Sequence, residues 1–271
     1  MDTRPVGIFD SGMGGVSLLR DALELLPNEN FIFYGDNANA PYGDRSEDEI
    51  LELTSRAADL LVGHGVKALV LACNTATSAA INVLRKKLEV PVVSIEPAIK
   101  PACSVPGEGK VFMLATAATT KLARYRALRA RMPEPDRVID VGISGLVARV
   151  ERGVIGVGEF DDILDKYLAP YHGMRADGVV LGCTHYIFPA EAIETYFKQH
   201  FEGPCRLFDG NRATVRQLGR VLAKNGLLNG SGCGRVEFST SGDAEALLPV
   251  FKMLLSTPIY TGGSANGGSA E

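Results

Sequence analysis

Two cysteines in this chain of 271 residues follow apolar runs of similar sequence. Cys73 lies in LVLACNTATSAA (69–80) and Cys183 in VVLGCTHYIFPA (179–190), and a helix is predicted after each. A lone cysteine at the end of an apolar strand is usually a small core residue. The second copy and the polar residues after both cysteines favour a chemical role, because open α/β sheets bind ligands at the carboxyl ends of their strands. A helix N-terminus beside each thiol would also stabilise a thiolate.

A pair of thiols suits one kind of chemistry better than others. Hydrolysis needs a single nucleophile with a base, and a redox pair usually has the close CxxC spacing. Two acid–base groups on opposite sides of a carbon can remove a proton from one face and return one to the other, which inverts a stereocentre. Because a thiolate is a weak base for a Cα proton, N–H and O–H donors must stabilise the substrate carboxylate as charge develops on it.

Three other uses of these residues stay open. His185 stands two positions after Cys183 and is either its proton partner or a solvent-facing side chain. Cys183 with His185 could serve a cysteine hydrolase. Cys73, Cys183 and His185 could bind zinc, although the chain has none of the paired ligand spacings that structural zinc sites usually show. We therefore predict no metal.

The Gly-rich stretch IFDSGMGG (8–15) follows the first predicted strand. It is not a P-loop, because no Gly-Lys-Ser/Thr follows, and Ser17 occupies the third glycine position of a dinucleotide-binding fingerprint. What remains is a carboxylate at the end of a strand, Asp10, and the hydroxyl of Ser11 in a turn that opens a helix. Asp10 is either part of a site or a helix N-cap.

Two further polar stretches follow predicted strands. In YGDNANAPYGDRS (34–46), the residues Pro41, Tyr42 and Gly43 predict a stiff turn that can offer backbone N–H groups, or an ordinary surface loop. In LATAATT, Thr116 and Thr119 are placed like Ser11, and their hydroxyls would bind an anion or cap a helix.

The elements that must position these residues alternate as strand, loop and helix. Apolar strands without clear alternation indicate parallel sheets covered by helices on both faces. Ser46 and Glu49 predict a capping box at the start of a helix that ends near Gly63 or Gly65. Predicted strands lie at 6–9 and within 30–36, 66–72, 91–95, 109–120, 178–190, 205–210 and 235–242; predicted helices lie within 17–27, up to about 88, near 156–170, near 189–200 and at 212–224.

The chain is predicted to contain two related α/β halves. GIFDSG (7–12) aligns with FMLATA (112–117), and LVLACNT (69–75) aligns with VVLGCTH (179–185). The last section would return to complete the first half. The predicted domains are 1–97 plus 207–260, a discontinuous first domain; 98–206, the second; and 261–271, a flexible Gly/Ser-rich tail.

Composition excludes several classes of protein. The net charge is −4, with no block of basic residues, so neither a nucleic-acid nor a membrane surface is indicated. The N-terminus lacks the apolar region of a signal peptide, and no segment has the length of a membrane span. Five scattered cysteines predict a reduced, cytoplasmic protein.

Four of these motifs, in this order, resemble the glutamate racemases of the aspartate/glutamate racemase superfamily: GIFDSGMGG, YGDNANAPYGDRS, ACNTATSAA and GCTHY. VEFSTSGD near the end also fits. The resemblance implies cofactor-independent interconversion of L- and D-glutamate, which supplies D-glutamate for peptidoglycan. It also implies two pseudo-two-fold related domains with the active site in the cleft between them, and a homodimer.

The resemblance also implies roles for individual residues. Cys73 would take the proton from D-glutamate and Cys183 from L-glutamate. Asp10 and His185 would assist the two thiols, with Glu151 supporting His185. The residues implied to hold the substrate are Asp10, Ser11, Pro41, Tyr42, Gly43, Asn74, Thr75, Thr116, Thr119 and Thr184.

Overall fold

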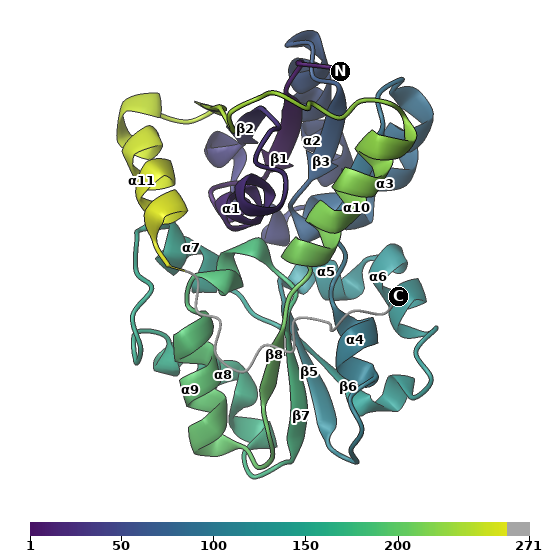
Figure 1. The fold of residues 1–271 in the computed structure, drawn as a ribbon. Coiled ribbons are helices and arrows are strands. Elements are labelled where there is room, and N and C mark those ends of the chain that lie inside the picture. The colour runs from purple at the N-terminus through teal and green to yellow at the C-terminus, as the bar shows by residue number, and fades with distance from the viewer. Residues whose placement is uncertain (259–271) are drawn as a thin grey trace. The chain divides into compact units, whose positions relative to one another are not determined.

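The chain folds into two compact units, each built on its own sheet (Figure 1). The computed structural model describes residues 1–258. Unit 1 comprises Met1–Glu96 and Asn211–Thr257, and unit 2 is built on Pro97–Gly210. The flexible tail predicted for 261–271 lies outside the described residues. None of the helices within residues 1–258 combines the length and apolar character that a membrane span requires.

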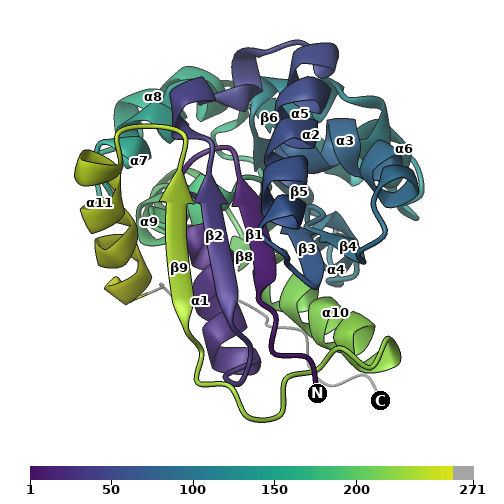
Figure 2. The same ribbon diagram turned by 90° about the horizontal axis from the view of Figure 1, so that it is seen from above.

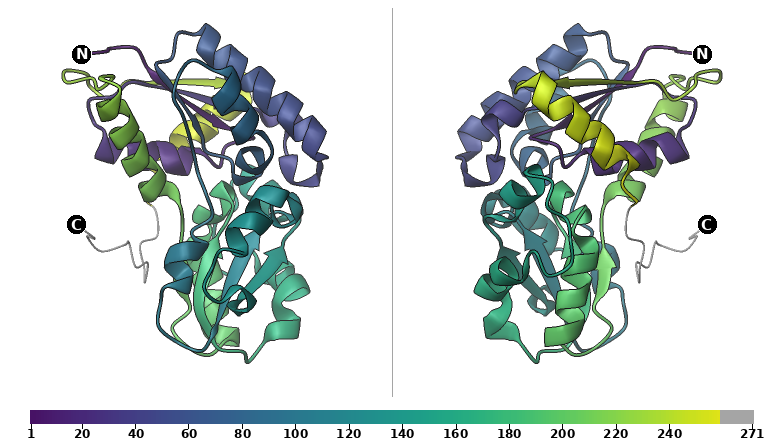
Figure 3. Two further views of the ribbon diagram at one scale, coloured as in Figure 1. Left: turned by 90° about the vertical axis from the view of Figure 1, so that its right-hand side faces the viewer. Right: turned by 90° about the vertical axis from the view of Figure 1, so that its left-hand side faces the viewer.

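Unit 1 has a five-stranded parallel sheet with the order β4-β3-β1-β2-β9. Its central strands are buried along their whole length, as their apolar sequences predict. In Figures 2 and 3, α1, α10 and α11 cover one face and α2 and α3 cover the other. The elements are β1 (Val6–Asp10), α1 (Val16–Leu25), β2 (Phe31–Gly35), η1 (Asn37–Asn39), η2 (Tyr42–Asp44), α2 (Glu47–Gly63), β3 (Ala68–Leu71), α3 (Asn74–Lys87), β4 (Val92–Ser94), α10 (Asn211–Lys224), β9 (Val236–Thr240) and α11 (Ala244–Ser256).

Unit 2 has a four-stranded parallel sheet with the order β6-β5-β7-β8. Alternate residues of β5 enter different cores: Phe112 packs with residues of α8 and α9, and Met113 packs with residues of α4 and α6. Figure 1 shows these helix pairs on opposite sides of the sheet. The elements are α4 (Ile99–Cys103), β5 (Lys110–Ala115), α5 (Ala117–Lys121), α6 (Ala123–Arg129), η3 (Pro135–Arg137), β6 (Val138–Gly142), α7 (Leu146–Glu151), α8 (Asp161–Leu168), η4 (Ala169–Tyr171), β7 (Ala176–Leu181), η5 (Thr184–Ile187), α9 (Ala190–His200) and β8 (Arg206–Phe208).

The two sheets repeat one strand order. Read in the same direction, β4-β3-β1-β2 of unit 1 corresponds to β8-β7-β5-β6 of unit 2. The aligned pairs β1 with β5 and β3 with β7 therefore occupy equivalent places. Two related α/β halves with parallel sheets, as the sequence predicts, are confirmed. Unit 1 adds β9 at one edge, where it pairs with β2.

Local signals predicted some boundaries better than others. The capping box is confirmed, because the Ser46 hydroxyl accepts from the Glu49 N–H and the Glu49 carboxylate accepts from the Ser46 N–H. The helix predicted near 156–170 is shorter, starting at Asp161, because Gly158 has a φ of 81° that a helix does not admit. The predicted boundary at residue 207 cuts through β8. This strand pairs with β7 in unit 2, so the boundary lies after it.

Candidate active site

Cys73 follows β3, an interior strand of the unit 1 sheet, and is the N-cap of α3. The thiol is 5% exposed, and its Sγ lies 3.3 Å from the Ser11 Oγ. The Ala76 N–H donates to the Cys73 Sγ at 3.4 Å. The first N–H groups of a helix have no partner inside the helix, and they carry the positive end of its dipole. The N–H at the start of the helix and the Ser11 hydroxyl are both groups that can donate a hydrogen bond to a thiolate.

Ser11 reaches Cys73 because β1 and β3 are neighbours in the sheet. The turn after β1 folds back on itself: the Gly12 N–H donates to the Asp10 Oδ1 at 3.0 Å. A Cβ on Gly15 would lie 2.7 Å from the Asp10 Cβ, so only glycine admits this close approach. The N-cap of α1 is Gly15, which excludes Asp10 as the cap. Asp10 is fully buried at the base of the turn.

The loop after β2 carries Pro41, Tyr42 and Gly43. Tyr42 is buried, and its hydroxyl donates to the Asp36 Oδ2 at 2.6 Å. Burial, the hydrogen bond to Asp36 and the charges of Asp36 and Cys73 raise the pKa of Tyr42 far above its ordinary value. Within residues 1–258, the backbone N–H groups of Tyr42 and Gly43 donate no hydrogen bond. The turn can therefore offer these two backbone N–H groups, which is one of the two predicted alternatives.

Asn74 and Thr75 begin α3 directly after Cys73. Both side chains are buried, although polar. The Oδ1 of Asn74 is buried without a hydrogen-bond partner in the described part of the chain. An unpaired buried acceptor costs free energy, about 1–3 kcal/mol. Such an atom beside a thiol is suited to accept a hydrogen bond from a ligand.

Cys183 ends the equivalent strand of unit 2 with different neighbours. Its Sγ lies 3.9 Å from the His185 Nδ1, and the His185 Nε2 lies 2.5 Å from the Glu151 Oε1. Burial lowers the pKa of His185, but the contacts with Cys183 and Glu151 outweigh it and leave that pKa well above its ordinary value. Thiol, imidazole and carboxylate form a linked acid–base chain, with Glu151 contributed by α7.

The helix predicted near 189–200 is confirmed as α9 (Ala190–His200), but its N-terminus does not follow Cys183 directly as that of α3 follows Cys73. The four-residue 3-10 turn η5 follows Cys183, which has no cap hydrogen bond, and α9 begins only at Ala190. Pro189 has no N–H to bond back to a preceding carbonyl, so the turn does not continue into the helix. Gly182 is required before the thiol, because a Cβ there would lie 2.9 Å from the Leu114 carbonyl oxygen of β5.

The threonines of unit 2 are also buried. Thr116 is the N-cap of α5: its Oγ1 accepts from the Thr119 N–H at 3.3 Å and lies 3.0 Å from the Thr119 Oγ1. The capping role predicted as one alternative is therefore present. Thr184 follows Cys183 and is 2% exposed.

The structure groups the predicted residues by unit. Unit 1 contains Asp10, Ser11, Pro41, Tyr42, Gly43, Cys73, Asn74 and Thr75, all at the carboxyl ends of β1, β2 and β3. Unit 2 contains Thr116, Thr119, Glu151, Cys183, Thr184 and His185, which follow β5, β6 and β7. No group of three His, Cys, Asp or Glu side chains within residues 1–258 could hold a metal ion.

Sequence reasoning missed Asp36. This carboxylate is 3% exposed and accepts from Tyr42, from the Asn39 Nδ2 at 2.9 Å and from the Ser241 Oγ at 2.6 Å. A signal was present, because Asp36 follows β2 as Asp10 ends β1.

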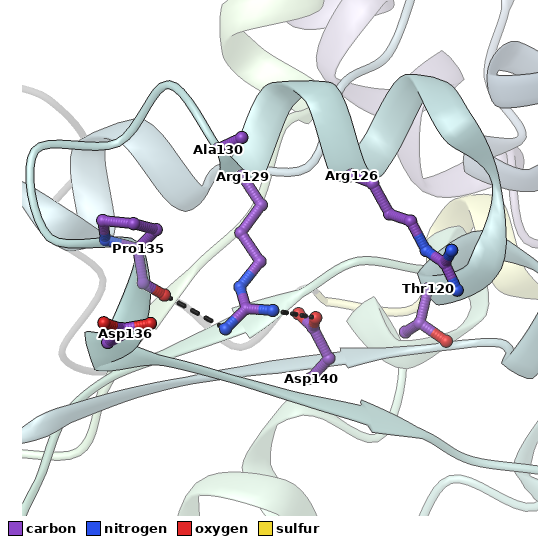
Figure 4. Close-up of a pocket in the computed structure, with 7 residues that line it drawn as sticks. All are labelled: Thr120, Arg126, Arg129, Ala130, Pro135, Asp136 and Asp140. Carbon is purple, nitrogen blue, oxygen red and sulfur yellow. Dashed lines mark hydrogen bonds and ion pairs between the residues drawn. The ribbon is translucent and has the colours of Figure 1, made fainter.

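A cavity of about 570 Å³ lies elsewhere in unit 2 (Figure 4). Two of its charged side chains pair with each other: Arg129 lies 3.2 Å from Asp140, and it also donates to the Pro135 carbonyl at 3.1 Å. None of its lining residues is a predicted site residue; they are Thr120, Arg126, Arg129, Ala130, Pro135, Asp136 and Asp140.

Known proteins match this chain over most of its length. The Asp/Glu/Hydantoin racemase family matches residues 16–218. The glutamate racemase of Clostridium novyi is 40% identical over 255 residues, which are 93% of this chain and 96% of that protein. The glutamate racemase of Francisella tularensis, solved with D-glutamate, has a TM-score of 0.81 at 27% identity, and the match covers 96% of both chains.

A second solved structure has the same fold. The glutamate racemase of Escherichia coli, solved with L-glutamate and the activator UDP-MurNAc-ala, has a TM-score of 0.76 at 30% identity, with 92% of this chain and 95% of that chain covered. Together with the repeated strand order and the two thiols, these matches show that the chain belongs to the Asp/Glu/hydantoin racemase family.

Proposed function

We propose that the protein interconverts L-glutamate and D-glutamate by proton transfer at Cα between two thiols. The observation that carries the proposal is that equivalent strands of two similar sheets end in buried thiols, each held by a polar partner. The family and the glutamate racemases similar to this chain support the same substrate.

The reaction needs one thiolate and one thiol, on opposite sides of Cα. In the D-to-L direction the Cys73 thiolate removes the Cα proton, and the electron pair of the C–H bond delocalises into the α-carboxylate. The Cys183 thiol then donates its proton to the opposite face. The reverse direction exchanges the roles, so the protein and its substrate exchange protons without a net redox change and without a cofactor.

Each thiol has its own means of stabilising the thiolate. Cys73 has the Ser11 hydroxyl and the N-terminus of α3, with Asp10 as the assisting carboxylate at the end of β1. Cys183 has His185, whose pKa is raised because the contacts with Cys183 and Glu151, which outweigh burial, favour the charged imidazolium. Glu151 balances that charge and fixes which ring nitrogen faces the thiol.

The remaining polar groups would hold the two carboxylates and the ammonium group of glutamate. Asn74, Thr75 and Thr184 adjoin the thiols in sequence, so we assign them to the α-amino and α-carboxylate groups. The free N–H groups of Tyr42 and Gly43 lie farther along the chain from either thiol, and we assign them to the side-chain carboxylate. Ser11, Pro41, Thr116 and Thr119 complete the proposed set.

The wider role follows from the product. D-glutamate made by this reaction would be used for peptidoglycan synthesis, and we propose that the protein works in the cytoplasm as a homodimer. We also propose that the two units act as the two catalytic domains.

Turnover measurements on four amino acids test the substrate. We expect racemisation of L- and D-glutamate, followed by circular dichroism, and little turnover of L- and D-aspartate. A preference for aspartate would overturn the assignment of glutamate.

Thiol variants test the mechanism. Cys73→Ser and Cys183→Ser should each reduce racemisation by about 10²–10⁴-fold, because each removes one of the two acid–base groups. Cys233→Ser is the matched control, since this cysteine is exposed and belongs to neither motif. A Cys73→Ser variant that racemises at nearly the full rate would overturn the two-thiol mechanism. Hydrolytic activity that survives Cys73→Ser, without racemisation by the unsubstituted protein, would instead indicate a hydrolase that uses Cys183 and His185.

A further inference from the structure

The buried carboxylate of Asp36 connects three separate pieces of unit 1. It accepts hydrogen bonds from the Tyr42 hydroxyl at 2.6 Å, the Asn39 Nδ2 at 2.9 Å and the Ser241 Oγ at 2.6 Å. Its backbone N–H donates to the Asp10 carbonyl at 3.0 Å, which fixes Asp36 beside the end of β1. Three side-chain donors on one carboxylate compensate for the loss of its hydration.

Ser241 belongs to the chain that returns to unit 1 near its end. It follows β9, which lies beside β2 with Thr240 opposite Gly35 (Figure 2). The Ser241 N–H donates to the Gly35 carbonyl at 3.1 Å, and the Ala38 N–H donates to the Ser241 Oγ at 3.1 Å. Thr240 donates from its Oγ1 to the Asn37 Oδ1 at 3.0 Å. The return segment is therefore bonded to the first part of the 36–45 loop.

Hydrophobic burial contributes little to holding this loop. Between residues 37 and 45, Tyr42 is the only buried residue. A loop with so little apolar anchorage is ordered chiefly by its hydrogen bonds, and the Tyr42 hydroxyl spends its donor on Asp36. The N–H groups of Tyr42 and Gly43, described above, are then left as donors that this loop can offer to a ligand.

We propose that Asp36 and Ser241 are positioning residues for substrate binding. Together with the Tyr42 hydroxyl they form what we call the Asp36 clamp: Asp36, Tyr42 and Ser241. The clamp holds the 36–45 loop so that the N–H groups of Tyr42 and Gly43 bind the side-chain carboxylate of the substrate, an inference that rests on the proposed glutamate racemase function. Neither Asp36 nor Ser241 needs to touch the substrate.

Ser241→Ala tests the clamp by removing one donor from Asp36. Hydrogen bonds to charged groups contribute enough that KM for glutamate should rise about tenfold. The side-chain carboxylate is bound alike in the ground state and the transition state, so kcat should stay within about twofold. Ser241→Thr keeps the hydroxyl and should restore KM. Ser256→Ala is the control, because that hydroxyl bonds only within α11 and should leave KM unchanged.

Two further measurements separate positioning from a general loss of structure. The first measurement compares KM for Tyr42→Phe, Ser241→Ala and the double variant. KM of the double variant should rise by less than the product of the two single increases, because both side chains act through Asp36. Amide hydrogen exchange should quicken over residues 36–45 in Ser241→Ala and not over α2. An unchanged KM, or a lowered kcat and melting temperature at constant KM, would overturn the clamp.

The clamp and the proposed function can fail separately. If the unsubstituted protein racemises glutamate but Ser241→Ala has an unchanged KM, the clamp is wrong and the function stands. If the unsubstituted protein racemises neither enantiomer, the proposed function is wrong. Unchanged amide exchange over 36–45 in Ser241→Ala would then also refute the clamp as the device that orders the loop.

Discussion

Cys73 and Cys183 end equivalent strands, yet their surroundings differ in kind. Cys73 contacts a neutral hydroxyl and an N–H at the start of an α-helix. Cys183 has no cap hydrogen bond and contacts an imidazole that is paired with a carboxylate. A hydroxyl and a backbone N–H do not titrate near neutral pH, whereas a protonated imidazole has a proton that can be lost. Two thiols at equivalent places in a repeated fold therefore have polar partners of different chemistry.

This contrast has a limited set of observable consequences. L- and D-glutamate have the same free energy in water, so kcat/KM must be equal in the two directions for every variant that still racemises. A difference between the thiols therefore appears in kcat and KM separately, and in the dependence on pH. The predictions below use these quantities, from the largest expected effect to the smallest.

Replacing Glu151 should have the largest effect, because it changes the imidazole–carboxylate pair beside Cys183. Glu151→Gln removes the charge paired with His185, and we expect kcat/KM to fall about 10²-fold. The pKa of His185 is raised in the folded protein, so its proton is lost only as pH rises through that raised value. Activity should decline on the alkaline side of the pH profile, and the decline should begin at lower pH in Glu151→Gln. The measurement is kcat/KM against pH.

His185 also affects how the stability of the folded protein depends on pH. A folded-state pKa above the unfolded value gives stability that is fully present below the unfolded pKa and is lost as pH rises through the folded pKa. If the decline in kcat/KM began at the same pH in the unsubstituted protein and in Glu151→Gln, His185 would not control that decline.

Removing the hydroxyl beside Cys73 should have a smaller effect that does not depend on pH. Ser11→Ala deletes the 3.3 Å contact with the thiol, and loss of a hydrogen bond to a charged group lowers kcat/KM about tenfold. The alkaline limb should stay where it is, since a hydroxyl does not titrate there. A limb that moved in Ser11→Ala as far as in Glu151→Gln would remove the distinction between the two thiols.

The smallest expected effect comes from a control variant that destabilises the protein away from both thiols. Ser46→Ala removes the capping box of α2 and should lower the free energy of unfolding by about 1 kcal/mol. Neither the alkaline limb nor KM should change, because Ser46 touches no thiol neighbour. Urea denaturation and the pH profile of the same preparation check this; a shifted limb would show that general destabilisation mimics the effects assigned to Glu151 and Ser11.

Local sequence signals predicted those features that depend on residues near one another in the chain. The capping box at Ser46 needs only a side chain three positions away, and the apolar runs before both cysteines are sufficient for buried parallel strands. Alignment of the two halves predicted the equivalent places of β3 and β7. The association of Glu151 with His185 came from the resemblance to glutamate racemases, since no local pattern joins them.

Tertiary structure decided which distant groups meet. Ser11 reaches Cys73 because β1 pairs with β3, and Ser241 reaches Asp36 because β9 pairs with β2. The sheet to which β8 belongs was decided in the same way, by strand pairing. Sequence patterns report burial and backbone preference over a few residues, whereas strand order brings together side chains far apart in the chain. The two thiols could therefore be identified from the sequence by itself. The hydroxyl and carboxylate groups that make the surroundings of the two thiols different were brought to them by the fold.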